Sequence, residues 1–582
     1  MDNIEKIIAE STELAAKWQQ RADKLLSSEE KTYQKRFQRL LKHSNDKVVL
    51  TKIIDQCFRS ANTGRVAGRV RSLFQRYGIP HFFLRRERLL IRFFLLFGRF
   101  FHRISIPVMI NTIIKECGRF ILPGEKEALL AVLQERRTNA VKMNINHIGE
   151  AVLGEDEARR HLNRYLEDLK RPEIEYISVK ISSLYSQTRP FAFEDSVAVI
   201  KDRLSILYST AQENFFAESN GAGRPKFVNL DMEGCQDLEI TVTAFMQALD
   251  EAGFESCPTG IALQSYLPES FELQQRLTDW ARQRTARGGG PIKIRIVKGA
   301  NLEMEKIESE INNWPLAPYD NKLDVDANFK RMLEFGMRPE NISAVHLGIA
   351  SHNLFELAFA YILSSQRRIG EYVVFEMLEG MAPHVMSAIQ ESTGKILMYA
   401  PVAVKARFIN AVAYLIRRLD ENTAEENFLR YACNLKTDST EWSFLKQQFI
   451  DACRRMHNPE MLSHRIQDRR DETFNEKKGT FYENEFVNEA DTDWSLSGNR
   501  KWAESIRNKW RKITGDESLK IPITVGGKDI FENRRKIEAM DPSSIRADLN
   551  EKVCVAVCAL AGKEDINSAA AIAGADPDQW RN

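Results

Sequence analysis

Charged side chains stand at the ends of several short apolar runs, where their types could bind a polar ligand. Lys180 lies in YISVKISSL, Asp231 in FVNLDME, Arg295 and Lys298 in IKIRIVKGA, and His352 follows SAVHLGIAS. Charges in a protein interior cost several kcal/mol each unless they are paired. The set therefore predicts mutual neutralisation and a polar ligand. For each residue alone a structural salt bridge is at least as good an interpretation as catalysis, and only their convergence on one rim favours a site.

Eight such β-prone runs occur in series, and amphipathic stretches long enough to be helices separate them. The runs are AVKMNINHIG from 140, YISVKISSL from 176, KFVNLDME from 226, TGIALQSY from 259, IKIRIVKGA from 292, SAVHLGIASH from 343, EYVVFEML from 371 and ILMYAPV from 396. Eight strand–helix units predict the α/β class and a closed (β/α)8 barrel. In such barrels the chemistry lies at the carboxyl ends of the strands. Side-chain alternation there groups Ser178, Lys180 and Ser182 on one face, and Asn229, Asp231 and Glu233 on another.

The segments on either side of the barrel, which we place at residues 136–435, have a different pattern. Residues 1–135 predict helices throughout, as an N-terminal helical arm and domain. Residues 436–515 predict a helical extension followed by a polar linker. The last segment, from Trp494, predicts helix with one short β-prone run at IPITVGG.

The composition excludes several classes of protein. A length of 582 residues predicts two to four folding units. With 83 basic and 81 acidic residues the net charge is +2, so we expect no nucleic-acid partner. The eight cysteines form no CxxC pair and the first residues do not resemble a signal peptide, so a reducing cytoplasm is the predicted location. Phosphate-binding loops, HExxH and zinc-like spacings are missing from the sequence, and we expect no metal.

The most hydrophobic segment runs from His81 to Ile110 and is interrupted by arginines every few residues. A helix that spans a membrane is therefore not expected. Arginine and Phe/Leu at helical spacing could lie on an anionic membrane surface or receive a partner. A helix packed on its own protein with a solvated basic face is the simpler interpretation.

The strand ends taken together are recognisable. KISSL, NLDMEG, ALQSY, RIVKGAN, ASHN, FEMLEGM, YAPV and AYLIRRLDEN occur in this order. The series resembles the proline dehydrogenase domain of the bifunctional proline utilization A flavoenzymes, over roughly residues 70 to 515. TDWSLSGNRKWAESIRNKW is similar to the junction with their second module, an aldehyde dehydrogenase, so residues 516–582 are expected to be a remnant of its start.

The resemblance implies FAD-dependent oxidation of L-proline to 1-pyrroline-5-carboxylate, by hydride transfer to flavin N5, with a quinone as the electron acceptor. Because little chain follows the junction, we expect proline dehydrogenase activity without aldehyde dehydrogenase activity. A peripheral contact with the inner face of the membrane and a separate aldehyde dehydrogenase partner stay open.

The resemblance also assigns the residues that bind the proline carboxylate. Lys180, Arg417 and Arg418 match these positions, and a planar guanidinium group can hold a carboxylate with two hydrogen bonds. Asp231 matches the active-site aspartate, which we expect to orient Lys180 rather than to abstract a proton. Glu421 is expected to steer an arginine or to cover the pocket.

Three further residues, Leu378, Tyr399 and Tyr414, are expected to line the pocket for the proline ring. For Leu378, plain core packing is an equal interpretation. Two positions depart from the family pattern. Asn301 stands where many members have tyrosine, which puts the gating of the site in doubt, and the interval from Tyr399 to Tyr414 is longer than in most members.

For the flavin, Arg295 matches the residue near N5, where a cation favours the reduced anionic ring, and Gln264 would hydrogen-bond the isoalloxazine. The other matching cofactor positions are Met232, Val297, Lys298, Gly299, Ala300, Ser351 and His352.

Two rival functions come from other classes. An aldolase could use Lys180 as a Schiff-base amine without a redox cofactor. A binding or regulatory module is the second, because some bifunctional members carry an N-terminal DNA-binding domain, although residues 1–135 show no strand followed by two helices of that kind.

Overall fold

The computed structural model describes most of the chain. The described residues are 4–58, 60–149, 152–218, 221–405, 408, 411, 414–418, 424–425, 427–432, 435–458, 462–472, 488–511, 517–542 and 553–576. They belong to two compact units, which are residues 1–466 with 486–491, and residues 467–485 with 492–582.

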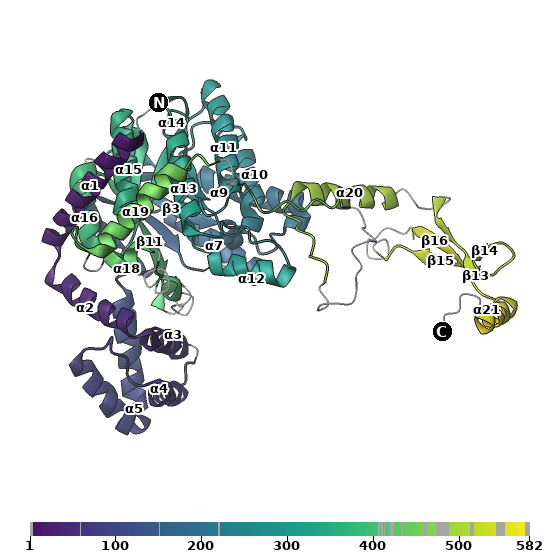
Figure 1. Cartoon of the computed structure of the whole chain (residues 1–582), viewed down its shortest axis with the longest axis horizontal. Helices are drawn as coiled ribbons and strands as arrows, with labels where there is room; N and C mark the ends of the chain where they lie inside the picture. Colours follow the sequence, from purple (N-terminus) through teal and green to yellow (C-terminus); the bar gives the residue numbers. More distant parts are fainter. Residues whose placement is uncertain are drawn as a thin grey trace. The chain divides into compact units, whose positions relative to one another are not determined.

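Eight parallel strands form a closed barrel in the first unit (Figure 1). They are β2 (Val141–His147), β3 (Tyr176–Lys180), β6 (Phe227–Asp231), β7 (Thr259–Gln264), β8 (Ile292–Val297), β9 (Val345–Ala350), β10 (Val373–Leu378) and β11 (Ile396–Ala403). Each strand pairs with the next along the chain, and β11 pairs with β2 to close the barrel. Seven of them lie inside the predicted runs and β11 extends one residue beyond its run, so the predicted (β/α)8 barrel is confirmed.

Helices cover the outside of this barrel because each strand is followed by an amphipathic segment whose apolar face packs on it. They are α7 (Glu155–Leu169), α9 (Phe193–Glu213), α10 (Leu238–Leu249), α11 (Glu269–Ala286), α13 (Lys322–Gly336), α15 (Leu354–Gln366) and α16 (Pro383–Thr393). Shorter or additional elements are β1 (Leu122–Pro123), β4 (Phe215–Ala217), β5 (Gly223–Pro225), α8 (Ile181–Leu184), α12 (Leu302–Asn312), α14 (Pro339–Ile342), α18 (Phe428–Ala432), α19 (Thr440–Arg455) and the 3-10 turns Pro190–Ala192, Cys235–Asp237 and Gly370–Tyr372.

The second strand of the barrel ends earlier than predicted. β3 stops at Lys180, and the residues Ile181–Leu184 form the short helix α8. The backbone N–H and the hydroxyl of Ser182 both donate to the carboxylate of Glu233, at 3.0 and 2.7 Å. The predicted strand alternation past Lys180 was therefore wrong, because a side chain from the next strand binds the backbone of this turn.

The N-terminal residues form the predicted helical region. α1 (Ile4–Leu25) packs on α15 and α16, where the indole of Trp18 donates to Ser392 at 2.8 Å. The remaining helices are α2 (Ser28–Lys42), α3 (Ser44–Phe58), α4 (Thr63–Tyr77), α5 (Arg85–Cys117) and α6 (Lys126–Thr138). A small separate core joins α3, α4 and α5 through Ile53, Val70 and Ile106.

The helix α5 has two unlike faces. Ile91, Phe94 and Ile106 point into the small core. The other face exposes large apolar side chains, which are Leu89, Leu90, Phe93, Leu96, Phe97, Phe100, Phe101, Ile104 and Val108. The helix thus packs on its own protein, as the simpler interpretation expected, but its outer face exposes large apolar side chains in addition to arginines.

The second unit contains α20 (Ser497–Arg511), α21 (Lys563–Ala575) and several short strands. These strands are β12 (Leu519–Ile521), β13 (Ile523–Val525), β14 (Lys528–Ile530), β15 (Lys536–Met540) and β16 (Cys554–Ala559). β13 and β14 form a hairpin across Gly526 and Gly527, which both have positive φ. The expectation of one β-prone run underestimated this sheet structure, because its strands are short and exposed and show little apolar periodicity.

Candidate functional site

Asp231 lies at the carboxyl end of β6 and is the centre of a buried hydrogen-bond network. Its Oδ2 accepts from the hydroxyl of Tyr399 at 2.7 Å, and its Oδ1 accepts from Arg295 Nη1 at 3.3 Å. Ser178 and Asn229 also donate to Oδ1, at 3.1 and 2.9 Å. The guanidinium of Arg295 lies 4.4 Å from the centre of the Tyr399 ring. The barrel thus brings together three residues that the sequence predicted for one site.

A second pair of charges, which the sequence reasoning missed, lies next to Arg295. Glu376 of β10 is fully buried and forms ion pairs through both oxygens. Its Oε2 lies 2.9 Å from Arg295 Nε, and its Oε1 lies 2.5 Å from the ammonium of Lys293. Lys293 also donates to the hydroxyl of Tyr176 at 3.2 Å. A signal existed in the sequence, because Lys293 and Glu376 each interrupt an apolar strand and a buried charge needs a partner.

Burial and these charges shift the pKa values of the network in different directions. Burial lowers the pKa of Arg295, but the charges of Glu376 and Asp231 outweigh it, so that the net shift is upward. Burial and the neighbouring Asp231 raise the pKa of Tyr399 well above its usual value. Burial lowers the pKa of Lys293 even though Glu376 opposes the shift. Arg295 is therefore a permanent cation and Tyr399 a neutral hydrogen-bond donor.

His352 follows β9 and has one ring nitrogen with no partner among the described residues. Its Nε2 accepts the backbone N–H of Leu378 at 3.0 Å, so its proton lies on Nδ1 when the ring is neutral. Burial first, and then the charge of Arg418, lower the pKa of His352 to about 3, which keeps the ring neutral. The buried Nδ1 is thus a hydrogen-bond donor that finds no acceptor in the part of the chain that is described.

Gln264 at the end of β7 has a buried acceptor that also lacks a hydrogen-bond partner among the described residues. Its amide nitrogen donates to the carbonyl oxygens of Glu233 and Met232, at 3.1 and 3.5 Å. Its Oε1 is buried and has no hydrogen-bond partner among the described residues. A buried polar group without a partner costs about 1–3 kcal/mol. An isoalloxazine ring offers both donors and acceptors, so Gln264 and His352 fit the flavin that was expected here.

Lys298, after β8, belongs to a separate ionic cluster. Its ammonium lies 2.5 Å from Asp326 and 3.1 Å from Glu356, and the fully buried Lys330 shares Glu356 at 2.8 Å. Burial lowers the pKa of Lys298, but the two carboxylates outweigh it and raise it overall. Two of its three donors are thus occupied, and the third has no hydrogen-bond partner among the described residues.

The turn that Val297 and Lys298 begin requires glycine. Gly299 has a φ of +135°, and a Cβ there would lie 2.5 Å from the ring of Tyr266. Ala300 follows it and is exposed, whereas Val297 is half-buried. The turn therefore keeps the backbone close to Tyr266.

The other predicted residues lie at the ends of β3, β6, β9 and β10 or on the helical residues 414–418. Met232, Tyr414 and Arg418 are buried, whereas Lys180, Ser351, Leu378 and Arg417 are half-buried. The guanidinium of Arg418 lies 5.1 Å from the ring centre of Tyr414, and its charge acts on His352. Glu421 lies outside the described residues.

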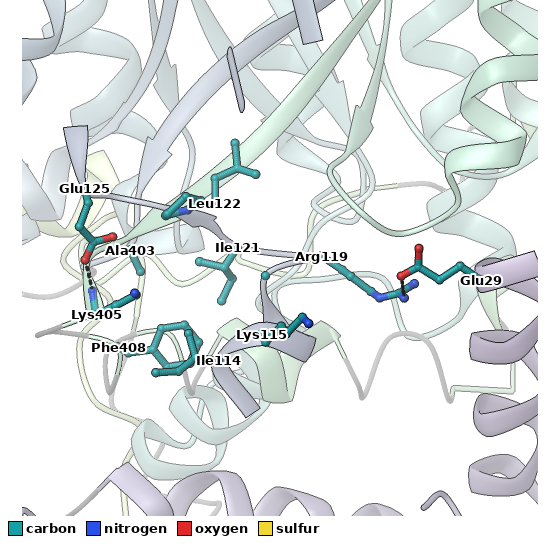
Figure 2. Close-up of a pocket in the computed structure, with 12 residues that line it drawn as sticks. Glu29, Ile114, Lys115, Arg119, Ile121, Leu122, Glu125, Ala403, Lys405 and Phe408 are labelled. Atoms are coloured by element: carbon teal, nitrogen blue, oxygen red, sulfur yellow. Dashed lines mark hydrogen bonds and ion pairs between the residues drawn. The ribbon is translucent and has the colours of Figure 1, made fainter. Parts of the chain in front are cut away.

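A cavity of about 470 Å³ opens beside the carboxyl end of β11 (Figure 2). Ile121, Leu122 and Phe408 form its apolar wall. Ile114 and Lys115, at the end of α5, line it as well. None of the predicted site residues is among the described residues that line it, so the cavity is not where the polar residues converge.

Comparison with known proteins identifies the family. The model of the proline dehydrogenase family matches residues 129–431. The chain belongs to this family. The matched segment contains the whole barrel with the described part of the candidate site.

Solved proline utilization A proteins resemble this proline dehydrogenase family member. The protein of Corynebacterium freiburgense is 35% identical with a TM-score of 0.57, over 70% of this chain and 37% of that one. The protein of Bdellovibrio bacteriovorus, solved after inactivation by N-propargylglycine, is 24% identical with a TM-score of 0.76, over 100% of this chain and 55% of that one. The chain thus spans between about a third and about half of the length of these relatives. A comparison with curated proteins found no match.

Proposed function

We propose that the chain is a flavin-dependent dehydrogenase that oxidises L-proline to 1-pyrroline-5-carboxylate and passes the electrons to a quinone. The observation that supports this most is the position of Asp231, Tyr399 and Arg295 in one buried network inside a proline dehydrogenase barrel. The buried Oε1 of Gln264 and Nδ1 of His352, which lack partners among the described residues, favour a bound FAD. When bound, the flavin supplies the acceptor for the hydride.

The protein's own groups then have distinct tasks. Arg295 would provide a permanent positive charge beside the flavin ring, since the pKa of this guanidinium is raised. Lys180, Arg417 and Arg418 would hold the proline carboxylate, and Tyr414 and Leu378 would line the pocket for the ring. Asp231 would hold Tyr399 and Arg295 in place rather than take a proton, because its two oxygens already accept four hydrogen bonds from buried donors.

The colour of the purified protein tests this proposal. We expect a yellow protein whose flavin absorbance is bleached by L-proline under anaerobic conditions and restored by a soluble quinone. D-proline is the matched negative control. A colourless protein that does not take up added FAD would contradict the proposal and favour the aldolase alternative, in which borohydride with a carbonyl substrate would trap Lys180.

We further propose that α5 rests on an anionic lipid surface, from which a quinone could be drawn. Its exposed apolar residues recur at positions 89, 93, 96 and 100, which is one face of the helix before the kink at Phe101, and positions 104 and 108 continue the series after the kink. Arg85, Arg86, Arg92 and Arg103 are exposed on the same helix, and no acidic residue occurs between Arg88 and Lys115. No helix among the described residues is long and apolar enough to cross a membrane, so this contact would be interfacial.

Vesicle flotation of the full chain tests the contact. We expect binding to vesicles of phosphatidylcholine with phosphatidylglycerol to exceed binding to pure phosphatidylcholine by about tenfold or more. Leu96→Gln with Phe100→Gln should abolish this binding, because these side chains are 69% and 80% exposed. Leu153→Gln with Phe191→Gln, at 96% and 65% exposure, is the matched control and should bind as the unmodified chain does. Equal binding by both double variants would refute the contact.

A further inference from the structure

Arg295 is held on two sides by carboxylates from different strands. Asp231 of β6 contacts Nη1 at 3.3 Å, and Glu376 of β10 contacts Nε at 2.9 Å. A guanidinium group has five N–H donors in one plane, and the two carboxylates lie at different edges of it. The contact with Asp231 is a hydrogen bond. The contact with Glu376 is an ion pair by distance, because Arg295 Nε and the two Glu376 oxygens make no hydrogen bond of normal geometry to the described residues. The two carboxylates thus restrict the place of the guanidinium from two sides.

Glu376 pairs with a second cation in addition to Arg295. Its second oxygen lies 2.5 Å from the ammonium of Lys293, whose side chain is 8% exposed. Lys293 in turn lies 4.9 Å from the ring centre of Tyr176 and 5.6 Å from that of Phe227. Together Asp231, Glu376, Lys293 and Arg295 carry two negative and two positive charges. Without Lys293 this buried group would have a net negative charge.

The barrel makes room for this pair at one glycine. β9 lies between β8 and β10, so Lys293 and Glu376 must meet across it. Gly348 of β9 stands at the crossing, where a Cβ would lie 2.2 Å from Glu376 Oε1 and 2.7 Å from Lys293 Cε. The backbone is thus adapted to this contact.

We propose that Glu376 and Lys293 are positioning residues for Arg295. Glu376 fixes the Nε edge of the guanidinium, and Lys293 occupies the other oxygen so that the carboxylate neither turns away nor cancels the charge of the arginine. The inference rests on the proposed function, because it takes Arg295 to act on a bound flavin.

Two double variants of the holoenzyme separate positioning from packing. Lys293→Met with Glu376→Leu removes one charge of each sign and the oxygens that face Arg295 Nε. Lys293→Met with Glu376→Gln removes the same charges but keeps an amide oxygen that can face Nε in place of the carboxylate oxygen. A merely structural role predicts that both variants lose stability and otherwise behave alike.

For the leucine variant we expect the rate constant of flavin reduction at saturating proline to fall by about tenfold to a hundredfold, since misplacement of a group by about 1 Å has this effect. The midpoint potential of the bound flavin should shift in the leucine variant, whereas the dissociation constant of proline should change less than about threefold. The glutamine variant should recover most of the lost rate. Arg367→Met with Glu334→Leu is the matched control and should leave rate and potential unchanged. It removes the 3.1 Å pair of Arg367 and Glu334 on the outside of the barrel, together with the 2.9 Å contact of Glu334 with Arg338.

An unchanged rate and potential in the leucine variant, or equal loss in both variants, would overturn the inference. FAD-free protein provides a second test that does not depend on the proposed function. In the Lys293→Met background, the effects of Glu376→Leu and Arg295→Met on the unfolding equilibrium should be non-additive by about tenfold, because the two side chains are in contact. Additive effects would refute the contact even if the protein takes up no flavin.

Discussion

Replacement of Tyr399 by phenylalanine measures how strongly the central network depends on its shortest hydrogen bond. The hydroxyl donates to Asp231 Oδ2 at 2.7 Å, and the two residues are 8% and 6% exposed. A buried hydrogen bond to a charged group contributes about 1.5–3 kcal/mol, which is about tenfold to a hundredfold in the unfolding equilibrium. We expect Tyr399→Phe to lower the free energy of unfolding by this amount in urea titrations at neutral pH.

The difference in free energy of unfolding between Tyr399→Phe and the unmodified chain should depend on pH in one direction. Burial and Asp231 raise the pKa of Tyr399 above its usual value of 10.0. A raised pKa means that the stability from the neutral hydroxyl is complete below pH 10.0 and is lost as the pH rises further. The difference between Tyr399→Phe and the unmodified chain should therefore be constant near neutral pH and shrink above that value.

Tyr361→Phe is the control for both measurements, because the hydroxyl of Tyr361 only reaches the carbonyl oxygen of Ser392 at 3.4 Å. Tyr361→Phe should lower the free energy of unfolding by less than about 1 kcal/mol. If Tyr399→Phe costs no more than Tyr361→Phe, the bond to Asp231 does not stabilise the barrel and the reasoning is refuted.

Three further predictions concern other residues. Arg418→Ala should raise the Michaelis constant for proline about tenfold or more while FAD stays bound. Unchanged kinetics would show that Arg418 does not bind the proline carboxylate. Burial and the charge of Glu233 raise the pKa of Asp237 from 3.8 to about 7. The stability that comes from the protonated carboxyl is therefore complete below pH 3.8 and is lost as the pH rises to about 7. Asp237→Asn should remove this decline in a pH series of unfolding midpoints, and an unchanged decline would contradict the shift. Gly348→Ala should destabilise the protein by about 1–3 kcal/mol. Gly370→Ala, whose Cβ would meet nothing within 4 Å, should not, and equal unfolding midpoints would contradict the crowding at Gly348.

The barrel could be predicted from the sequence because its strands are buried on both faces. The strand Thr259–Gln264 is buried at every position, and its central residues 260–263 form an apolar run without alternation. The helix at Ile181–Leu184 could not be predicted in this way, since ISSL continues the alternation of the strand before it. Only the bond from Ser182 to Glu233, a residue 51 positions away, shows why the strand ends.

For the candidate site, the sequence predicted residue types, but the one pair that it predicted, Asp231 with Lys180, does not include the contacts of Asp231 with Tyr399 and Arg295. Asp231, Arg295 and Tyr399 were assigned by resemblance, and the structure brings them together. Their partners Lys293 and Glu376 were missed although each is a charged residue in a largely apolar strand, because the sequence does not show which charge faces which. Which charges meet across a barrel depends on the register of strands that are far apart in sequence, and a single sequence does not contain it.

The charges of the buried network bear on which cations could bind a substrate carboxylate. The two carboxylates of Asp231 and Glu376 already compensate Arg295 and Lys293, so the interior of the barrel is close to neutral. A carboxylate that entered this site would add an uncompensated negative charge, which is costly away from water. The proposed ligands of the proline carboxylate, Lys180, Arg417 and Arg418, lie outside this network, at the end of β3 and on the helical residues 414–418. Arg295 belongs to the network, so its proposed task is to act on the flavin rather than to bind the carboxylate.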